Sequence, residues 1–448
     1  MPKRIVIIGA HAAGVDAASA ARKTDRTAEI TLLTEEKHAG YSRCGLPFVL
    51  GGHIPSFNSL IVFPQPYFQM MKLDLRTETK ATAINTQNKT VETVDKNGKT
   101  ETILYDSLII ATGASSFMPP IKGKEKPGIH SLRTLADGEQ IDKAIEKGAK
   151  TAVIMGAGLI GLETAIAFQE RGLKVTVVEM LPQVLPQALD PEMAKMIQEM
   201  LEKKGITILI GKGVEEFLGD EKVTGIIAGG EQINADLFMS AFGVRANTQL
   251  AANAGIALGE TRAIKTNARM ETNVKDVYAI GDCAETIALV TQRPALPQLG
   301  TVAVREGKVA GMNAAGGYSL FTGALGSAIS RLFETDCGWT GLTEAAAQRA
   351  RFETVTGTIS SKTRADYYPG ALPIKVKLVT EKESQRIIGA QIIGGEEVTQ
   401  RINAISLAIQ RQMTARDLAK ADTAYAPPVC ETWEPLVLAA EMVLMKLR

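Results

Sequence analysis

The chain has 448 residues, a formal net charge of +1 and 45% apolar residues. This length predicts two or three domains, and the balanced charge argues against a nucleic-acid surface or an acidic tail. No apolar run approaches the roughly 20 residues that a membrane-spanning helix requires. Four cysteines without metal-ligand spacing and four scattered histidines give no reason to expect a metal site. The N-terminal residues enter a strand pattern directly, without signal-peptide features, so we expect a cytoplasmic protein.

The N-terminal segment has the pattern of a βαβ nucleotide-binding unit. KRIVIIGAHAAGVDAASAARK, followed by EITLLTEE, reads as an apolar strand, a glycine-rich turn, an alanine-rich helix and a second strand. The turn GAHAAG retains Gly9 and Gly14 but has His11 at the middle glycine. Either a phosphate binds somewhat differently here, or the turn is purely structural. The candidate contacts are His11, Ala12 and Ala13 in the turn and, for ribose hydroxyls, Glu35 or Thr34 beside it.

A single cysteine lies in the glycine-rich stretch GYSRCGLPFVLGG. The position where a C-x4-C pair would close is Val49, so Cys44 has no local disulfide partner. The thiolate is the reactive form of cysteine, and the adjacent Arg43 is expected to favour it. The oxidised form would then be a mixed disulfide with a small thiol, a persulfide or a sulfenic acid. The alternative is a packing residue, although a Gly-Leu-Pro loop lacks the pattern of a core.

Two apolar segments end in residues suited to a bound dinucleotide. LIIATGA contains Ala111, Thr112 and Gly113 after its strand, and VYAIGD ends in Gly281 and Asp282. Ligands of open α/β sheets bind at the carboxyl ends of the strands, and a carboxylate there suits a ribityl hydroxyl. The alternative for Asp282 is a helix N-cap.

A second βαβ unit, TAVIMGAGLIGLETAIAFQERG followed by KVTVVEM, has a complete G-x-G-x-x-G turn. Gly156 permits the tight turn, Gly158 lets a pyrophosphate approach the backbone, and Gly161 lets the helix pack on the strand. Glu179 ends the next strand, where a carboxylate accepts from ribose hydroxyls and repels a 2′-phosphate. The following MLPQVLPQ has no cation, so we expect NADH rather than NADPH. The remaining candidate contacts of this site are Leu159, Ile160 and Gly243.

The two units, with YSRCGLPFVLGG, ADYYPG and AYAPP, resemble the flavin-dependent pyridine-nucleotide disulfide oxidoreductases over essentially the whole chain. The likeness is to the single-cysteine branch, which contains coenzyme A disulfide reductase, NADH oxidase, NADH peroxidase and related persulfide reductases. It implies NAD at the GAGLIG turn, Cys44 over the flavin, and a homodimer in which the C-terminal domain completes the partner's active site. The residues that it assigns to FAD are Gly9, Gly14, Glu35, Thr112 and Asp282.

We therefore expect an α/β fold with two Rossmann-like domains and a C-terminal α+β dimerisation domain. The FAD-binding domain would be discontinuous, at 1–117 and 244–320. The NAD(P)H-binding domain would occupy 118–243, and the dimerisation domain 321–448.

The resemblance also assigns residues of the C-terminal segment to the active site. Tyr425 and Tyr367, and less strongly Tyr368, would donate a proton or hydrogen bond to the leaving thiolate from the partner subunit. The alternative is aromatic packing at the dimer interface. Cys430 is a candidate resolving thiol supplied in trans, with a small interface residue as the alternative. Cys283 and Cys337 are expected to be buried packing residues.

Coenzyme A would need cations for its phosphates. Arg22, Lys23 and Arg26 end the first helix, where the coenzyme A reductases of the family carry basic residues. They are equally expected of a solvated helix C-terminus. Ser42 and Asn58 complete the candidate substrate contacts.

The expected function is reduction of a small-thiol disulfide or persulfide, with coenzyme A as the leading thiol and electrons passing from NADH through FAD to Cys44. The first alternative is an NADH oxidase or peroxidase, in which Cys44 cycles through a sulfenic acid. The second is an electron-transfer flavoprotein that reduces a protein partner, against which the Cys44 loop argues.

Overall fold

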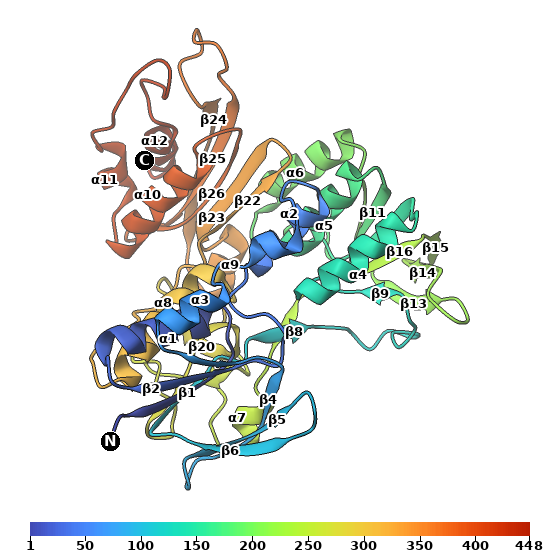
Figure 1. The fold of residues 1–448 in the computed structure, drawn as a ribbon. Coiled ribbons are helices and arrows are strands. Elements are labelled where there is room, and N and C mark those ends of the chain that lie inside the picture. The colour runs from blue at the N-terminus through green and yellow to red at the C-terminus, as the bar shows by residue number, and fades with distance from the viewer.

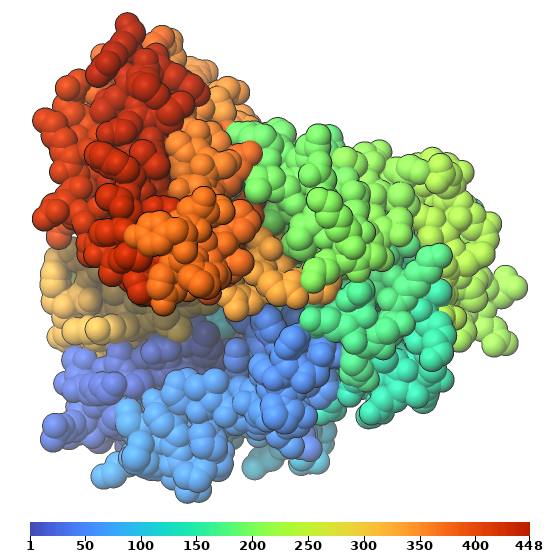
Figure 2. Space-filling model, turned by 90° about the horizontal axis from the view of Figure 1, so that it is seen from above, coloured from blue at the N-terminus to red at the C-terminus, as the bar shows by residue number.

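The computed structural model describes residues 1–448, and they form three lobes (Figures 1 and 2). The first lobe combines N-terminal segments with segments that follow residue 244, drawn in blue and yellow. The second, drawn mainly in green, carries the GAGLIG turn, and the third, orange to red, is C-terminal. No helix in the protein combines the length and apolar character needed to cross a bilayer.

A parallel five-stranded sheet forms the centre of the first lobe. Its strands, in spatial order, are β19 (Val277–Ala279), β7 (Ser107–Ile110), β1 (Arg4–Ile8), β2 (Glu29–Leu33) and β3 (Asp74–Arg76). The apolar run of β1 is buried on both faces, as a parallel sheet requires. Because β19 pairs with β7, residues from both sides of the second lobe in sequence share one sheet. An antiparallel sheet adjoins it, made of β4 (Thr79–Asn85), β5 (Thr90–Asp95) and β6 (Thr100–Leu104).

Two helices, α1 (Ala12–Thr24) and α8 (Gly300–Ala314), pack side by side in this lobe (Figure 1). Their backbones approach closely because α8 has glycines where α1 passes. A Cβ on Gly307 would lie 2.3 Å from the carbonyl oxygen of Ala13, and one on Gly311 would lie 2.1 Å from that of Ala17. The alanine-rich composition of α1 therefore reflects a close helix–helix contact.

Glu306 connects α8 to the short turn η3 (Gly281–Cys283). Its side chain is buried, and Oε2 accepts a hydrogen bond from the backbone N–H of Gly281 at 2.7 Å. Oε1 is also buried and has no hydrogen-bond partner in the protein. Burial raises the pKa of this carboxyl to about 8, against the effect of the Gly281 N–H, and nearby Asp282 adds to the rise. Glu306 is therefore protonated at neutral pH.

The second lobe repeats the parallel design. Its strands, in spatial order, are β12 (Thr207–Ile210), β11 (Lys174–Glu179), β10 (Thr151–Met155), β16 (Leu237–Ser240) and β9 (Ile129–His130). Three longer helices belong to this lobe, α4 (Leu135–Glu146), α5 (Leu159–Glu170) and α6 (Pro191–Lys203). An antiparallel sheet of β13 (Val214–Leu218), β14 (Gly225–Ala228) and β15 (Glu231–Asn234) completes it.

The third lobe is an antiparallel sheet with helices packed against it (Figure 1). The helices in contact with the sheet are α10 (Val398–Gln410) and α12 (Pro435–Lys446). The strands, in spatial order, are β22 (Ala328–Leu332), β23 (Thr335–Gly341), β26 (Ile387–Gly394), β25 (Pro373–Glu381) and β24 (Thr354–Lys362). Cys337 of β23 and Cys283 of η3 are fully buried, as expected of packing cysteines.

A buried ion cluster joins the second and third lobes. Lys377 on β25 is 1% exposed, and its ammonium lies 2.9 Å from Asp190 at the start of α6. Glu192 and Glu344 lie 2.5 and 3.0 Å from the same ammonium. Gln391 of β26 donates to Asp190 at 2.6 Å. Because the charges compensate one another, the cluster fixes the second lobe against the C-terminal sheet.

Replacing Lys377 with methionine should destabilise the protein by about 3–5 kcal/mol, because it leaves the buried Asp190 carboxylate without its cation. Thermal and urea unfolding would measure the loss. Lys195→Met is the matched control, since its side chain is 75% exposed and pairs only with Glu199, so its effect should stay within about 0.5 kcal/mol. Equal stability of the two variants would contradict this account.

Glu306 predicts a pH dependence of stability. Its carboxyl keeps a proton in the folded protein up to a pH of about 8, whereas the unfolded chain releases it near 4.5. Stability should therefore fall as pH rises through this window. Glu306→Gln keeps an acceptor for Gly281 but does not titrate, so from pH 6 to pH 8.5 it should gain roughly 2–3 kcal/mol on the unmodified protein. Parallel pH dependence of the two unfolding midpoints would show that Glu306 is not the titrating group.

Candidate active site

The turn of the second lobe has space for a phosphate. Gly156 has φ +117°, and a Cβ there would lie 2.4 Å from the carbonyl oxygen of Ala241. A Cβ on Gly161 would lie 2.1 Å from the carbonyl oxygen of Gly156, so both positions require glycine. A Cβ on Gly158 would meet nothing within 4 Å. Gly158 is the N-cap of α5, whose first turn has no acidic residue, so this helix terminus suits an anion.

Glu179 lies directly over this turn. Its carboxylate accepts from the N–H of Ala157 and from that of Leu181, each at 2.8 Å. The expected ribose-binding acid is therefore held rigidly beside the phosphate position. Lys212 is close in the chain fold, because its N–H donates to the carbonyl oxygen of Glu179, but its ammonium pairs with Glu231 at 2.7 Å.

The other expected contacts of the second turn surround it. Leu159 and Ile160 form the first turn of α5, and Ile160 is exposed. Gly243 has φ +98° and lies at the crossover between lobes, where its carbonyl oxygen accepts from the N–H of Phe117 at 2.9 Å.

The turn of the first lobe has the same backbone shape. Gly9 also has φ +117°, and a Cβ there would lie 2.1 Å from the carbonyl oxygen of Ala111. A Cβ on Gly14 would lie 1.8 Å from the carbonyl oxygen of Gly9. Gly281 reaches the same place, because its Cβ would lie 3.1 Å from that of Ala13. The fold thus brings the strand ends expected to bind one dinucleotide to a single turn.

His11 and Glu36 form a hydrogen-bonded network beside this turn. His11 Nε2 lies 2.9 Å from Glu36 Oε1, and the Tyr41 hydroxyl donates to Glu36 Oε2 at 2.5 Å. The Arg43 guanidinium also donates to Glu36. These partners outweigh the opposing effect of burial and hold the pKa of Glu36 at about 2, and burial raises the pKa of Tyr41 to about 13. Glu36 is therefore an ionised carboxylate.

Sequence reasoning selected Glu35 or Thr34 rather than Glu36. Glu35 is exposed and pairs with Lys80 at 3.5 Å, whereas Thr34 is buried and its hydroxyl accepts from the N–H of Glu36. Glu36 is the carboxylate nearest the first turn. No spacing rule separates two adjacent glutamates at a strand end, so the sequence gave no signal for this choice.

Asp282 makes an ion pair that the sequence did not indicate. Its carboxylate accepts from Arg133 at 2.6 Å, and η3 has no side-chain cap, so Asp282 does not act as a helix N-cap. Arg133 lies just before α4 and also donates to the carbonyl oxygen of Ala114 at 3.1 Å. Nearby, the Thr112 hydroxyl donates to the carbonyl oxygen of Asn247 at 2.7 Å, and Gly113 has φ +66°.

Two buried polar atoms support a dinucleotide at the first turn. His11 Nδ1 and Glu306 Oε1 are both buried and lack a partner within the protein. Buried polar atoms are nearly always paired, and these two belong to segments that meet at Ala13 and Gly281. The residues present therefore fit a polyhydroxylated phosphate ligand at the first turn, as Gly158 and Glu179 do at the second.

Cys44 lies where the two nucleotide-binding lobes meet. It is the central residue of η1 (Arg43–Gly45), which runs into the short helix α2 (Leu46–Leu50). Helix α2 packs against α4 and α5 of the second lobe. Val49, at the position of a second redox cysteine, is 9% exposed and belongs to the core of this junction. Cys44 itself is exposed, so a small molecule can reach it.

The surroundings of Cys44 disfavour its thiolate in the protein alone. Although its surface is exposed, the crowding of protein atoms raises the pKa of the thiol, and the carboxylates of Glu163 and Asp282 raise it further. Arg133 opposes this rise. The prediction that Arg43 favours the thiolate is wrong, because its guanidinium binds Glu36 and the carbonyl oxygen of Arg133. Glu163 on α5, a residue that sequence reasoning missed, is held by the Ser330 hydroxyl at 2.7 Å.

The candidate substrate residues fall into two groups. Ser42 donates its N–H to the carbonyl oxygen of Leu60, at the end of the turn η2 (Phe57–Leu60) that carries the exposed Asn58. Arg22 donates to five backbone carbonyls at distances of 2.7–3.4 Å, so it fastens the end of α1 to its neighbours. This arrangement matches the alternative reading of Arg22 as a helix-terminus residue. Lys23 and Arg26 are exposed.

The C-terminal lobe brings two of its candidate residues together. The hydroxyls of Tyr367 and Tyr425 are 2.9 Å apart, and both side chains are exposed. Tyr368 is also exposed, and Cys430 Sγ accepts from the N–H of Ala426 at 3.2 Å in the same loop as Tyr425.

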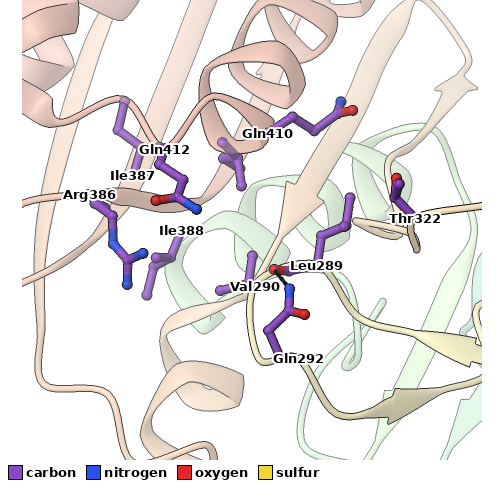
Figure 3. Close-up of a pocket in the computed structure, with 10 residues that line it drawn as sticks. Leu289, Val290, Gln292, Thr322, Arg386, Ile387, Ile388, Gln410 and Gln412 are labelled. Atoms are coloured by element: carbon purple, nitrogen blue, oxygen red, sulfur yellow. Dashed lines mark hydrogen bonds between the residues drawn. The ribbon is translucent and has the colours of Figure 1, made fainter.

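Two cavities lie away from Cys44. One, of about 590 Å³, is lined by Cys430, Arg401 and Glu434. The other, of about 320 Å³, lies between the first and third lobes, where Leu289 and Gln292 face Arg386 and Gln412 (Figure 3). The second cavity contains none of the residues expected to act on substrate or cofactor.

Comparison with known proteins places the chain in a family. Residues 3–307 match the family model described as pyridine nucleotide-disulphide oxidoreductase, and residues 330–437 match its dimerisation domain. An NADH oxidase from Methanocaldococcus jannaschii is 43% identical over 446 residues, with 99% of both chains covered. An NAD(P)H coenzyme A polysulfide/persulfide reductase from Pyrococcus horikoshii is 32% identical, also with 99% of both covered. The structure of an NAD-dependent persulfide reductase from A. fulgidus has 38% identity and a TM-score of 0.96, covering 99% of this chain and 83% of that one. The chain belongs to the pyridine nucleotide-disulphide oxidoreductase family.

Proposed function

We propose that this protein reduces a disulfide or persulfide of a small thiol, coenzyme A foremost, with NADH as the electron donor. The family is FAD-dependent and uses NAD(P)H. The observation that carries the proposal is Cys44, exposed between two nucleotide-binding turns with a buried valine where a partner cysteine would be. The second sulfur of the redox reaction therefore arrives with the substrate. The relatives named as persulfide reductases support this class of substrate.

The reaction balances with one reactive cysteine. The Cys44 thiolate attacks one sulfur of a disulfide, forming a mixed disulfide and releasing one thiolate, which takes up a proton. Bound FAD supplies a two-electron relay from NADH. Two electrons then break the mixed disulfide, restoring the Cys44 thiolate and releasing the second thiol. With a persulfide, the species released in the first step is hydrosulfide, and one NADH and one proton are consumed in either case.

The C-terminal lobe is proposed to act across a homodimer. Its segment 330–437 matches a dimerisation domain, and it exposes apolar side chains such as Val429 and Trp433, at 54% and 61%. Exposed apolar side chains in one region mark a contact surface. Tyr425 and Tyr367 lie in the same lobe, so their linked hydroxyls would reach the leaving thiolate of the partner's site as a pair.

An NADH oxidase or peroxidase activity is the second candidate. It is favoured by the name of the relative from M. jannaschii. In that case peroxide oxidises Cys44 to a sulfenic acid, which two electrons reduce to thiolate and water. Both candidates use the same residue, so the choice between them depends on the electron acceptor.

Cys44→Ser separates the two half-reactions. NADH should still bleach the flavin absorbance, because hydride transfer does not need the thiol, whereas turnover with coenzyme A disulfide or persulfide should fall at least about 100-fold. Cys430→Ser is the matched control and should keep its turnover, since the second sulfur belongs to the substrate. Stopped-flow mixing of the reduced enzyme with each acceptor measures both effects. Fastest reoxidation by oxygen or peroxide would instead support the second candidate, and loss of turnover in Cys430→Ser would indicate a resolving thiol.

Glu179→Gln tests the proposed preference for NADH. The amide keeps an acceptor for the N–H of Ala157 but removes the charge that repels a 2′-phosphate. The ratio of kcat/KM for NADH to that for NADPH should fall at least about fivefold, mainly through KM. Glu170→Gln, at the far end of α5, should leave the ratio unchanged. An unaltered ratio in Glu179→Gln would remove Glu179 as the determinant of the preference.

A further inference from the structure

His11 occupies the position that a glycine holds in the second turn. His11 is the N-cap of α1 as Gly158 is of α5, and both have extended backbones, with ψ of −159° and −178°. An extended backbone accepts any residue, so the imidazole is present without strain. In the second turn the corresponding space is open, because a Cβ on Gly158 meets nothing within 4 Å. A side chain at this position must therefore either obstruct the ligand or bind it.

The imidazole is held in one orientation. Nε2 lies 2.9 Å from Glu36 Oε1, and the ring meets the Tyr41 ring edge-on, with centroids 4.7 Å apart. Since Glu36 is ionised, Nε2 carries a proton and donates it to the carboxylate. Nδ1 then points to the opposite side of the ring, where it is buried and lacks a partner in the protein. Leaving a buried polar atom unpaired costs about 1–3 kcal/mol.

The chemistry around Nδ1 favours a phosphate. The first turn of α1 has no acidic residue and no side-chain cap, so the helix terminus presents backbone N–H groups and a partial positive charge. The second turn, with the same backbone shape, has space for a phosphate where the first has the imidazole.

We propose that His11 is a ligand of the FAD diphosphate, donating from Nδ1 to a phosphate oxygen while Glu36 holds the ring. The proposal rests on FAD binding at the first turn, which is part of the proposed function. His11 thus replaces the close backbone approach of a glycine with a charged hydrogen bond.

Protonation of His11 couples FAD affinity to pH. In the protein alone, burial lowers the pKa of His11, and Arg43 and Arg133 add to this, while Glu36 opposes it. Tyr41, the remaining titratable neighbour, stays neutral over the physiological range because its pKa is about 13. A diphosphate beside Nδ1 raises the pKa again, so binding takes up a proton. The affinity for FAD should therefore fall as pH rises above neutrality.

The test uses full-length protein stripped of FAD, titrated with FAD from pH 6 to pH 8.5 by flavin fluorescence. His11→Gly, which restores the glycine of the second turn, should weaken binding at least tenfold at pH 6.5 and abolish the pH dependence. His11→Gln keeps a neutral donor and should bind with intermediate, pH-independent affinity, so the test survives if the glycine variant fails to fold. Calorimetry in buffers of different ionisation enthalpy should show proton uptake only with His11.

Unchanged or tighter binding by His11→Gly would overturn the proposal, because the ring would then only fill space. The same pH dependence in His11→Gln and the unmodified protein would overturn it too. NAD⁺ binding at the second turn should be equal in all three proteins, which controls for folding. Failure of Cys44 turnover with normal FAD binding would count against the proposed function alone, and a chain that binds no FAD would refute both.

Discussion

The packing of α2 between the two nucleotide-binding lobes is the constraint on which the site depends. Leu46, Val49 and Leu50 belong to the same core as residues of α5, so the helix is fixed to both lobes at once. Cys44 precedes this helix and is held at the junction of the two turns. A cysteine at position 49 would place a polarisable thiol in that core. Valine fills it instead, and the reactive thiol is left without a local partner.

Charges around Cys44 set a condition on its reactivity. Glu163 approaches from the second lobe and Asp282 from the first, and both stabilise the neutral thiol. Arg133 opposes them, but it is itself paired with Asp282 at 2.6 Å. A ligand that engages Asp282 would change the balance of charge near Cys44 by altering this pair. The cofactor site and the reactive thiol are therefore electrostatically connected through one arginine.

The two glycine-rich turns show how one backbone shape serves two chemistries. Gly9 and Gly156 have the same φ, and Gly14 and Gly161 each pack against the carbonyl oxygen of the first glycine. These positions cannot carry a side chain, because a Cβ would overlap backbone atoms. The middle position is less constrained, so it is glycine in one turn and histidine in the other. The departure at His11 is accompanied by a carboxylate, Glu36, that positions the ring.

The sequence by itself determined the local units: two βαβ units, their glycine turns, Glu179 at a strand end, and a lone cysteine in a loop. Each follows from short-range rules, because strand, turn and helix periodicity and glycine φ preferences act over a few residues. The family membership that the quoted motifs indicated was confirmed by the comparisons. The expected electrostatic role of Arg43 failed, because adjacency in sequence does not determine where a long side chain finds its partner.

Tertiary structure alone decided which charges meet. Glu36 rather than Glu35 lies on the first turn, Arg133 crosses to Asp282, and Glu306 reaches Gly281 from another helix. Lys377 likewise meets Asp190 across two lobes. These pairs join residues far apart in the chain, and no periodicity encodes them. They form because burial makes an unpaired polar group costly, and only the packed fold determines which partner lies within reach.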